Sequence, residues 1–558
     1  MKSKKLLAYM FSMTLASSII LSGCNKEQSG NDKPTDKADA DQYLNVLLGA
    51  EPQTLDPSKS YDIYSAGIHV NTMEALTRLE SDENGNDIVK PGIAESWKQS
   101  DDGLTWTFKL RDAKWSDGEP ITAEQFVYGI TRTLDPNTAS PMGYLLFPIK
   151  NGKNFNSGKA KAEELGIKAT DKNTLVITLE SPCAYFLNMT YFKIMEPQRS
   201  DLITKHGDKY GSESNTMAYN GPYKITDWTH DNKIELAKNP EYWDVKSVKL
   251  EKATMKVIKE ESARMNELFN GSLDLAGVSS KEWITKLDAT GEFSVKKGYS
   301  TSINYSFFNQ ENKYFKNAKI RKAFAVADDR AGSVSSLYRD LAEPCYAWVP
   351  PAVNIGTEEF RKSTNYTPVE QLIKENPDPK ALLIEGLKEE GLDPDPSKHT
   401  ITILQSGTSA RAKEMAEFTQ QTYNKSLGIN MAIDFTEWAI FLQRTDDMDY
   451  ELASMSVTAD YNDPMTYFDM FMSTAPVVKT GWKNTKFDDI VEQAGKTVDQ
   501  NKRKELFKEA EKIFIYDDAV VSPTAWGFKN TYVHNYVKNY MAPTFGSVDL
   551  KYTYTQGR

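Results

Sequence analysis

Short stretches of β-strand character alternate with helical stretches along the whole chain, and they do not separate into an all-α half and an all-β half. The strand candidates include Leu44–Leu48, Thr105–Leu110, Leu175–Leu179 and Ile401–Leu404. Longer helices are predicted at Ala410–Leu427, where Gly428 follows as a C-cap, and at Asn501–Tyr516. This interleaving predicts a mixed α/β (α+β) fold.

The size and composition of the chain narrow its class further. Its 558 residues are enough for two or more domains. The 10 Trp, 28 Tyr and 24 Phe can fill large cores, which excludes an intrinsically disordered protein. A net charge of −11 without any dense Lys/Arg stripe argues against a nucleic-acid partner. With 3 Cys and 5 His, we expect neither a disulfide framework nor a metal or other cofactor.

The N-terminus has the pattern of an export signal. Lys2, Lys4 and Lys5 precede an apolar stretch at 6–21, which is shorter than the roughly 20 residues of a membrane-spanning helix. The stretch ends in Leu-Ser-Gly-Cys24, which resembles a bacterial lipobox. In such signals the cysteine receives a diacylglyceryl group and becomes the mature N-terminus, so we predict a signal peptide at 1–23 and lipidation of Cys24. The alternative is an ordinary signal peptide with an incidental cysteine.

The residues after Cys24 predict a flexible tether. Between positions 25 and 41 there is no aromatic or large aliphatic residue, so this stretch cannot bury enough apolar surface to fold. We therefore expect a tether at 24–42 and a globular part from Tyr43. Cys183 and Cys345 are the remaining cysteines, and they form either a disulfide or two separate buried thiols.

The usual catalytic motifs are missing from the sequence. It contains no H-E-x-x-H, no G-x-S-x-G and no C-x-x-C, and the P-loop-like ending at Gly495 lacks the leading glycine, because Ile490 stands there. A pair of carboxylates for glycoside chemistry cannot be recognised by pattern among 78 acidic residues. A secreted carbohydrate-active hydrolase is therefore the alternative to a binding protein.

Ten segments, spread over almost the whole mature chain, follow one another as in a known family. They are Glu51–Pro57, Pro91–Trp97, Asp102–Arg111, Lys114–Pro120, Thr122–Phe126, Leu134–Pro136, Asn220–Lys224, Lys238–Trp243, Phe315–Phe324 and Ala459–Pro464. In these segments the chain resembles the oligopeptide/dipeptide-type solute-binding proteins, which are the extracytoplasmic receptors of ABC peptide importers. The order of the segments makes a chance match very unlikely, although each is weak alone.

The resemblance implies a two-lobed fold of the periplasmic-binding-protein type II kind, with an extra insertion domain and a hinge that closes the lobes on a ligand. Transferred to this chain, it places lobe I at 43–73, 198–299 and 521–558. The insertion domain is expected at 74–197 and lobe II at 300–520.

The resemblance also implies a peptide site around Asp460. This residue matches the family's acidic partner of the ligand's α-ammonium group, and Ser456 to Thr458 match the segment that pairs with the ligand backbone. The chain departs from the family here, since Ser456 and Val457 replace a Gly-aromatic pair. The alternative is that Asp460 or Asp463 only bonds nearby amides within an Asp-Tyr-Asn-Asp-Pro turn.

Other contacts are implied with less support from the sequence. Tyr61 and Ile63 fall where the family's second backbone-pairing segment lies, and Trp438 falls on a pocket-lining tryptophan, although it could instead be a core residue of a helix at 437–443. Tyr144 is a candidate from the insertion domain. The family's carboxylate-binding arginines have no clean match, and Arg444 is the nearest substitute.

The predicted function is that of a peptide receptor rather than an enzyme. We expect a monomer with an oligopeptide ligand, ABC permease subunits as partners and a lipid anchor on the extracellular face of the cytoplasmic membrane, as in Gram-positive-type bacteria. A peptide-pheromone sensor on the same fold is the second possibility, and the hydrolase is the third.

Overall fold

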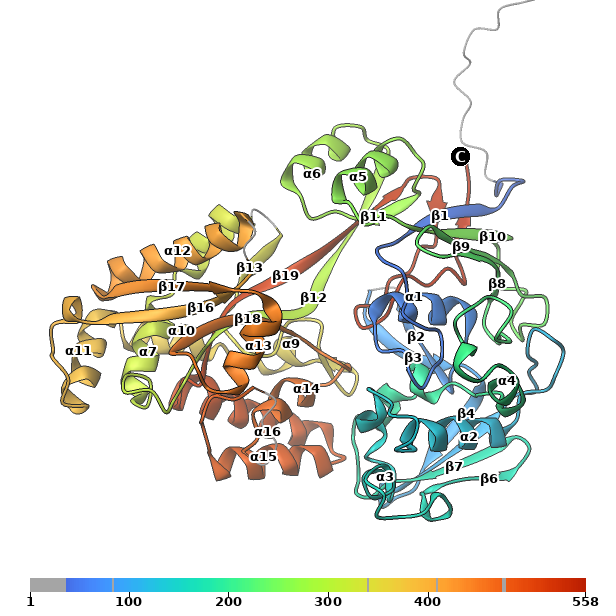
Figure 1. Ribbon diagram of the computed structural model, residues 1–558, viewed down its shortest axis with the longest axis horizontal. Helices are drawn as coiled ribbons and strands as arrows, with labels where there is room; N and C mark the ends of the chain where they lie inside the picture. Colours follow the sequence, from blue (N-terminus) through green and yellow to red (C-terminus); the bar gives the residue numbers. More distant parts are fainter. Residues whose placement is uncertain (1–36, 83–84, 339–340, 408–409, 474–477) are drawn as a thin grey trace, which may run out of the picture.

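The computed structural model describes residues 37–82, 85–338, 341–407, 410–473 and 478–558. They form two bodies joined by two long strands that run side by side, β12 (Phe293–Phe308) and β19 (Val521–His534) (Figure 1). The predicted signal peptide, Cys24 and most of the predicted tether lie outside the described residues. Lobe I, insertion domain and lobe II are used below for the residue ranges given above, whose boundaries stay predictions.

One mixed sheet runs through both bodies, in the order β17-β16-β18-β12-β19-β11-β1-β10-β9-β8, with β13 beside β19. β12 is antiparallel to both β18 and β19, whereas β16 and β17 are parallel, as are β1 and β10. The remaining strands are β1 (Tyr43–Leu48), β8 (Tyr223–Thr229), β9 (Lys233–Lys238), β10 (Lys252–Val257), β11 (Leu275–Gly277), β13 (Ala342–Pro344), β16 (Thr400–Ser406), β17 (Asn430–Thr436) and β18 (Leu452–Thr458). The predicted mixed α/β class is confirmed.

The insertion domain has a smaller sheet of its own. It is antiparallel, in the order β4-β5-β7-β6, and α2 (Ala123–Leu134) packs against β6 and β7. The strands are β4 (Ala94–Gln99), β5 (Thr105–Leu110), β6 (Ile167–Asp171) and β7 (Thr174–Thr178). A capping box marks the start of α2, in which the Gln125 side chain accepts a hydrogen bond from the Thr122 backbone N–H at 3.1 Å.

Helices cover the sheet in lobe II. One group of three helices packs together, namely α7 (Ala318–Ala327), α11 (Pro379–Glu389) and α12 (Ala410–Leu427). Two further helices, α15 (Thr485–Lys496) and α16 (Gln500–Glu511), pack against each other. The helix predicted at 410–427 is confirmed, and Gly428 follows it with φ +75°, a backbone conformation that glycine adopts without strain. The helix predicted at 501–516 is α16 with a π-helical continuation at Lys512–Asp517. Shorter helices used below are α1 (Ile63–Thr72), α13 (Trp438–Asp446) and α14 (Met465–Phe468).

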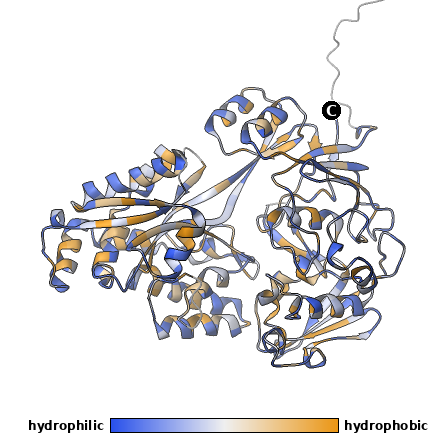
Figure 2. Ribbon diagram, viewed as in Figure 1, coloured by the Kyte–Doolittle hydropathy of each residue, from blue (hydrophilic) through white to orange (hydrophobic). Residues whose placement is uncertain are grey.

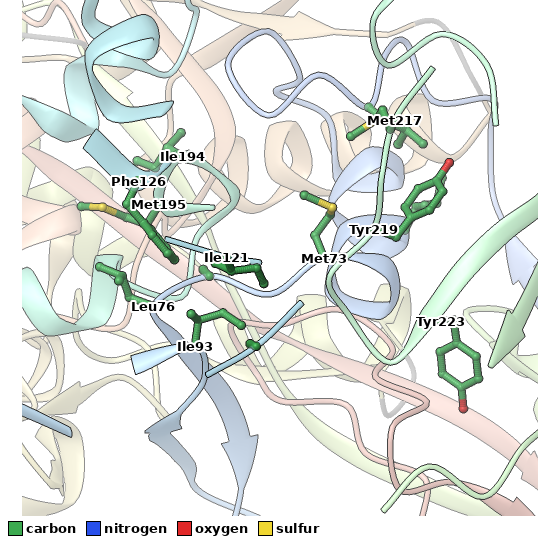
Figure 3. Packing of buried hydrophobic residues seen from close by; sticks show 14 of the residues in the cluster. Met73, Leu76, Ile93, Ile121, Phe126, Ile194, Met195, Met217, Tyr219 and Tyr223 are labelled. Atoms are coloured by element: carbon green, nitrogen blue, oxygen red, sulfur yellow. The ribbon is translucent and has the colours of Figure 1, made fainter. Parts of the chain in front are cut away.

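The hydrophobic cores follow the two bodies. One large cluster joins lobe I to the insertion domain, and Figure 3 shows part of it, with Met73 of lobe I near Leu76, Ile93 and Ile121. Two further clusters, which include Phe307 and Phe324, are formed mainly by lobe II, and the first of them also contains Val521 and Trp526 of β19. The first half of β12, between the bodies, is mostly hydrophilic (Figure 2). The two bodies therefore have separate cores and a polar connection.

Packing of the described N-terminal residues begins before the predicted start at Tyr43. Asp39 N donates to Thr555 O at 3.0 Å, and Gly557 N donates to the Asp39 carboxylate at 2.8 Å. The C-terminal segment, distant in sequence, thus holds residues that composition alone assigned to the tether. Cys183 and Cys345 are two separate buried thiols. Among the residues described, no helix is long and apolar enough to cross a membrane.

Candidate ligand-binding site

A cavity of about 480 Å³ lies where lobe I, the insertion domain and lobe II meet. Lobe I contributes the start of α1, and the insertion domain contributes residues 191–194 and Glu196. Lobe II contributes the end of β18 and the loop after it, from Thr458 to Asp460. This volume falls in the usual range of small-ligand sites.

The predicted residues Tyr61, Ile63, Thr458 and Asp460 all line this one cavity, although about four hundred positions separate the two pairs. Asp62 fixes the first pair, because its carboxylate caps α1 by accepting from the backbone N–H groups of Tyr64 (3.0 Å) and Ser65 (2.8 Å). The side chains of Tyr61 and Ile63 are left 54% and 74% exposed. Such exposure of apolar surface inside a cavity indicates a place for a ligand.

The loop after β18 contains two acids, Asp460 and Asp463, which have different surroundings. Asp463 is buried and accepts two hydrogen bonds from the Arg503 guanidinium, at 2.8 and 2.9 Å, and a third from Met465 N at 3.0 Å. Asp463 therefore holds the turn. Asp460 is solvent-accessible in the cavity, and its backbone N–H, not its carboxylate, bonds Thr466 Oγ1 at 3.1 Å.

The Asp460 carboxylate has no cationic partner among the described residues. Burial by the surrounding protein raises its pKa, while the nearby Tyr144 hydroxyl acts in the opposite direction. The same environment raises the pKa of Tyr144 to about 12, through burial and then the charge of Asp460. A cation placed beside Asp460 would stabilise its ionised form.

Tyr144 lies in a short 3-10 helix of the insertion domain, so its contact with Asp460 joins that domain to lobe II. Two neighbouring contacts do the same. Tyr185 stacks on Tyr461 with ring centroids 4.7 Å apart, and Asn188 Nδ2 donates to Asn462 O at 2.6 Å. The insertion domain thus packs directly on the loop that carries Asp460.

The edge of β18 leads to Asp460 and is open. On one side β18 pairs with β12 as far as Thr458, but on the other side β16 pairs with it only as far as Ser454 within the part of the chain described. The backbone from Met455 to Thr458 thus has a free edge. Ser456 lies on this edge, exposed, and its hydroxyl donates to Ile303 O at 3.3 Å. An extended peptide can pair with such an edge.

Two predicted residues lie on α13 and do not line this cavity. Trp438 stacks on Phe441 with centroids 5.5 Å apart and is half exposed. The Arg444 guanidinium bonds Asp434 at 2.7 Å and Asp449 at 2.9 Å. Both acids belong to lobe II, so the arginine is already neutralised within its own lobe. A ligand role for either residue stays a prediction.

Several charged residues of the cavity were not predicted from the sequence. His69 is buried, with Nδ1 at 2.8 Å from a Glu196 carboxylate oxygen, and Arg78 lies between Glu74 and Asp549. His69 and Glu196, and likewise Arg78 and Asp549, are more than one hundred positions apart along the chain. No local motif could therefore have revealed these two ion pairs. Lys193 and Lys529 also line the cavity. No cluster of three or more metal-binding side chains occurs in the described ranges.

With this geometry in view, comparison with known proteins identifies the family. The model of the bacterial extracellular solute-binding proteins, family 5 Middle, matches residues 89–478. The chain belongs to this family. The dipeptide-binding protein DppE of Bacillus subtilis is 32% identical over 551 residues, with 97% of each chain covered.

Two solved structures extend the comparison to the fold. Listeria monocytogenes OppA bound to peptide has a TM-score of 0.71 and 29% identity, covering 93% of this chain and 99% of that one. The pheromone receptor PrgZ, whose mode of peptide binding has been described, has a TM-score of 0.72 and 28% identity, covering 92% and 100%. The solute-binding fold implied by the sequence is therefore confirmed.

Proposed function

We propose that the protein is an extracytoplasmic receptor that captures oligopeptides in the cavity between its lobes and delivers them to an ABC importer. The observation that carries this proposal is Asp460, which faces the cavity just after a strand with a free edge and has no cationic partner among the residues the structure describes. The names of DppE and OppA, which refer to dipeptides and oligopeptides, support it.

The mechanism uses the features that all peptides share. The ligand's α-ammonium group bonds Asp460, and its backbone pairs with the edge of β18 at Ser456 and Thr458. Tyr61 and Ile63 approach from lobe I and Tyr144 from the insertion domain. Bending of β12 and β19 between the bodies then closes the cavity, which removes water and strengthens the charge pair. No step breaks or forms a covalent bond, and a hydrolase has no support from the family.

A double-mutant cycle tests the proposal, with peptides identified by native mass spectrometry of the purified protein as ligands. Asp460→Asn keeps the size of the side chain but removes the countercharge of the ammonium group. We expect a loss of about 2–5 kcal/mol, roughly 30- to 4000-fold in Kd, measured by calorimetry. N-terminal acetylation of the peptide should cost wild type a similar factor, and the two changes together much less than their sum.

Asp489→Asn is the matched control, because Asp489 is an exposed acid on α15 that does not line the cavity. Its binding should equal that of wild type. Additive losses in the cycle, or an Asp460→Asn protein that binds free-amine peptides normally, would return Asp460 to the role of a turn residue.

The cellular arrangement is part of the proposal. Cys24 receives the diacylglyceryl group and becomes the mature N-terminus when residues 1–23 are removed. A short tether then holds the receptor as a monomer at the extracellular face of the cytoplasmic membrane, beside its permease. Cys24→Ala should release the protein into the medium, because the lipid on Cys24 is the proposed anchor. Labelled palmitate that still enters the Ala variant would contradict this.

A pheromone-sensing role is the second candidate, favoured by the likeness to PrgZ. It uses the same cavity and differs in ligand choice. Retained peptides of mixed sequence would indicate nutrient uptake, whereas a single retained sequence would indicate sensing.

A further inference from the structure

A second cavity, of about 250 Å³, lies between the insertion domain and lobe II. It shares no lining residue with the cavity described above. The insertion domain contributes Pro148 and residues between Ser181 and Tyr185, and lobe II contributes Asp469 together with residues of α14 and α15. In Figure 1, α14 lies on the side of lobe II that faces the insertion domain. Movement of lobe II away from the insertion domain would therefore open this second cavity to water.

Side chains of the insertion domain hold the two bodies together beside the second cavity. Tyr185 stacks on Tyr461 of lobe II. Tyr185 and Phe192 pack both against the core shared by lobe I and the insertion domain and against a core formed mainly by lobe II. The Asn188 side chain donates to the backbone of Asn462. Because β12 and β19 connect the bodies elsewhere, these contacts would break if the bodies separated.

Asp469 is an acid at this contact. Its carboxylate accepts a hydrogen bond from the Tyr461 hydroxyl at 3.3 Å, and it has no ion pair with a cation among the described residues. Tyr144 and Tyr185 of the insertion domain lie near enough for its charge to raise their pKa values. The insertion domain thus covers a carboxyl group that would be in water after separation, and covering an unpaired charge costs free energy.

The other titratable groups that line the second cavity or act on Asp469 offer it no free countercharge. Some stay neutral near pH 7, because burial raises their pKa values far above that pH. They are Cys183, Tyr144, Tyr185 and Tyr461. Others are already paired, Asp463 with Arg503 and Glu492 with Lys496. Within the described part of the chain, the carboxyl group of Asp469 therefore loses its charge by taking up a proton.

The electrostatics agree with this geometry. Burial raises the pKa of Asp469 to about 7, the charges of Asp460 and Asp463 add to this, and the Tyr461 hydroxyl acts against it. Separation of the bodies would remove most of the burial and bring the pKa back toward the ordinary 3.8. The state in which the insertion domain contacts lobe II consequently binds the proton more tightly.

We propose that protonation of Asp469 controls closure of the receptor: the insertion domain and lobe II stay in contact when this carboxyl group is protonated and separate when it is ionised. The proposal rests on the two-lobed receptor proposed above, and it adds control of peptide capture by the acidity of the medium. Acid favours the closed state, so peptide affinity should rise as the pH falls from about 8 to about 5.5. The ammonium group of the peptide keeps Asp460 ionised over this range.

The distance between two spin labels follows closure without any peptide. The labels are attached through Lys172→Cys in the insertion domain and Lys486→Cys in lobe II, both at exposed positions of the full mature protein. This protein also carries Cys24→Ala, and its remaining thiols are buried. We expect the ratio of short to long distances to fall by up to roughly 30-fold between about pH 5.5 and about pH 8, as a pKa of about 7 in the closed state and 3.8 in the open state requires.

Three variants isolate the role of Asp469. Asp469→Asn should keep the distances short at every pH, because its amide carries no charge, whereas Asp469→Glu should keep the pH dependence. Tyr185→Ala removes the stacking contact and should lengthen the distances at every pH. The matched control is Asp489→Asn, at an exposed acid on α15 that lines neither cavity, and it should follow wild type.

Calorimetry extends the test to binding, with the peptides of the double-mutant cycle above as ligands. In buffers of different ionisation enthalpy near pH 6.5, wild type should take up part of a proton for each peptide bound, and Asp469→Asn should take up less. Distances in wild type that do not change with pH, or an unchanged pH dependence in Asp469→Asn, would overturn the control by Asp469 and leave the peptide receptor intact. Distances that change with pH as expected in a protein that retains no peptide would instead overturn the proposed function alone.

Discussion

Asp460 and Asp463 lie three residues apart in the loop between β18 and α14, and their carboxylates meet different surroundings. Asp463 is enclosed with Arg503 in a bidentate pair, whereas Asp460 faces the cavity near the Tyr144 hydroxyl and, within the described part of the chain, without a cationic partner. The buried half of the loop is thus complete without a ligand, and the cavity-facing half is not. A motif can carry both a structural and a binding acid, and only the positions of their partners distinguish them.

The buried half should be the more sensitive to mutation. Asp463→Asn leaves the Arg503 guanidinium buried without its countercharge, which we expect to lower the free energy of unfolding by about 3–5 kcal/mol. Equilibrium denaturation measures this loss. The double variant Asp463→Asn with Arg503→Met removes both charges and should recover part of the stability. A single variant as stable as wild type would show that the pair does not hold the loop.

A third acid near this loop, Asp469, makes the free energy of unfolding depend on pH. Burial raises the pKa of Asp469 from 3.8 to about 7, the Tyr461 hydroxyl counteracts this, and the charges of Asp460 and Asp463 add to it. Because the folded state binds the proton more tightly, this contribution to stability is complete below pH 4 and is lost as the pH rises through about 7. The full effect is at most about 4 kcal/mol.

Asp469→Asn should remove this dependence, so the variant should gain stability relative to wild type as the pH rises from about 4 to about 8. Denaturation midpoints at intervals of pH measure the difference between the two proteins, and Asp489→Asn serves as the control. Parallel curves for wild type and Asp469→Asn would mean that Asp469 titrates normally.

Much of the fold could be predicted from the sequence because its signals are local. The Thr122 and Gln125 pair marks the start of α2, and Gly428 marks the end of α12. The neighbourhood of Asp460 could also be predicted, since Thr458 ends the strand directly before the loop that carries Asp460. The cavity's other charges could not be predicted, because residues such as Lys193 and Lys529 reach the cavity only through the tertiary fold. The ion pairs of Arg444 with Asp434 and Asp449 could not be foreseen from spacing alone.

The contact between Tyr144 and Asp460 predicts a smaller effect on peptide binding. A carboxylate has acceptor sites for a phenol and an ammonium group together, so we expect Tyr144 to orient Asp460 rather than compete with the ligand. Tyr144→Phe should weaken peptide binding by roughly 2- to 10-fold. Loss of the hydroxyl should also raise the pKa of Asp460, so the low-pH limb of binding should move to higher pH.

Calorimetry across a pH series measures both effects. Tyr128→Phe, on α2 of the same domain and away from the cavity, is the control and should bind like wild type. Tighter binding by Tyr144→Phe would show instead that the tyrosine occupies the ammonium position in the empty receptor.

The smallest effect is expected for Asp460→Asn on folding, in direct contrast with Asp463→Asn. Burial raises the pKa of Asp460, so ionisation at neutral pH works against the folded state and the amide relieves that cost. Since the side chain is solvent-accessible, the gain should stay below about 1 kcal/mol. It should vanish as the pH falls below the ordinary Asp pKa of 3.8, where the wild-type carboxyl is protonated in both the folded and the unfolded state. Denaturation of the two Asp→Asn variants side by side measures the contrast. A loss of stability at position 460 comparable to that at position 463 would show that both acids hold the loop, and that the Asp460 carboxylate is not kept free for a ligand.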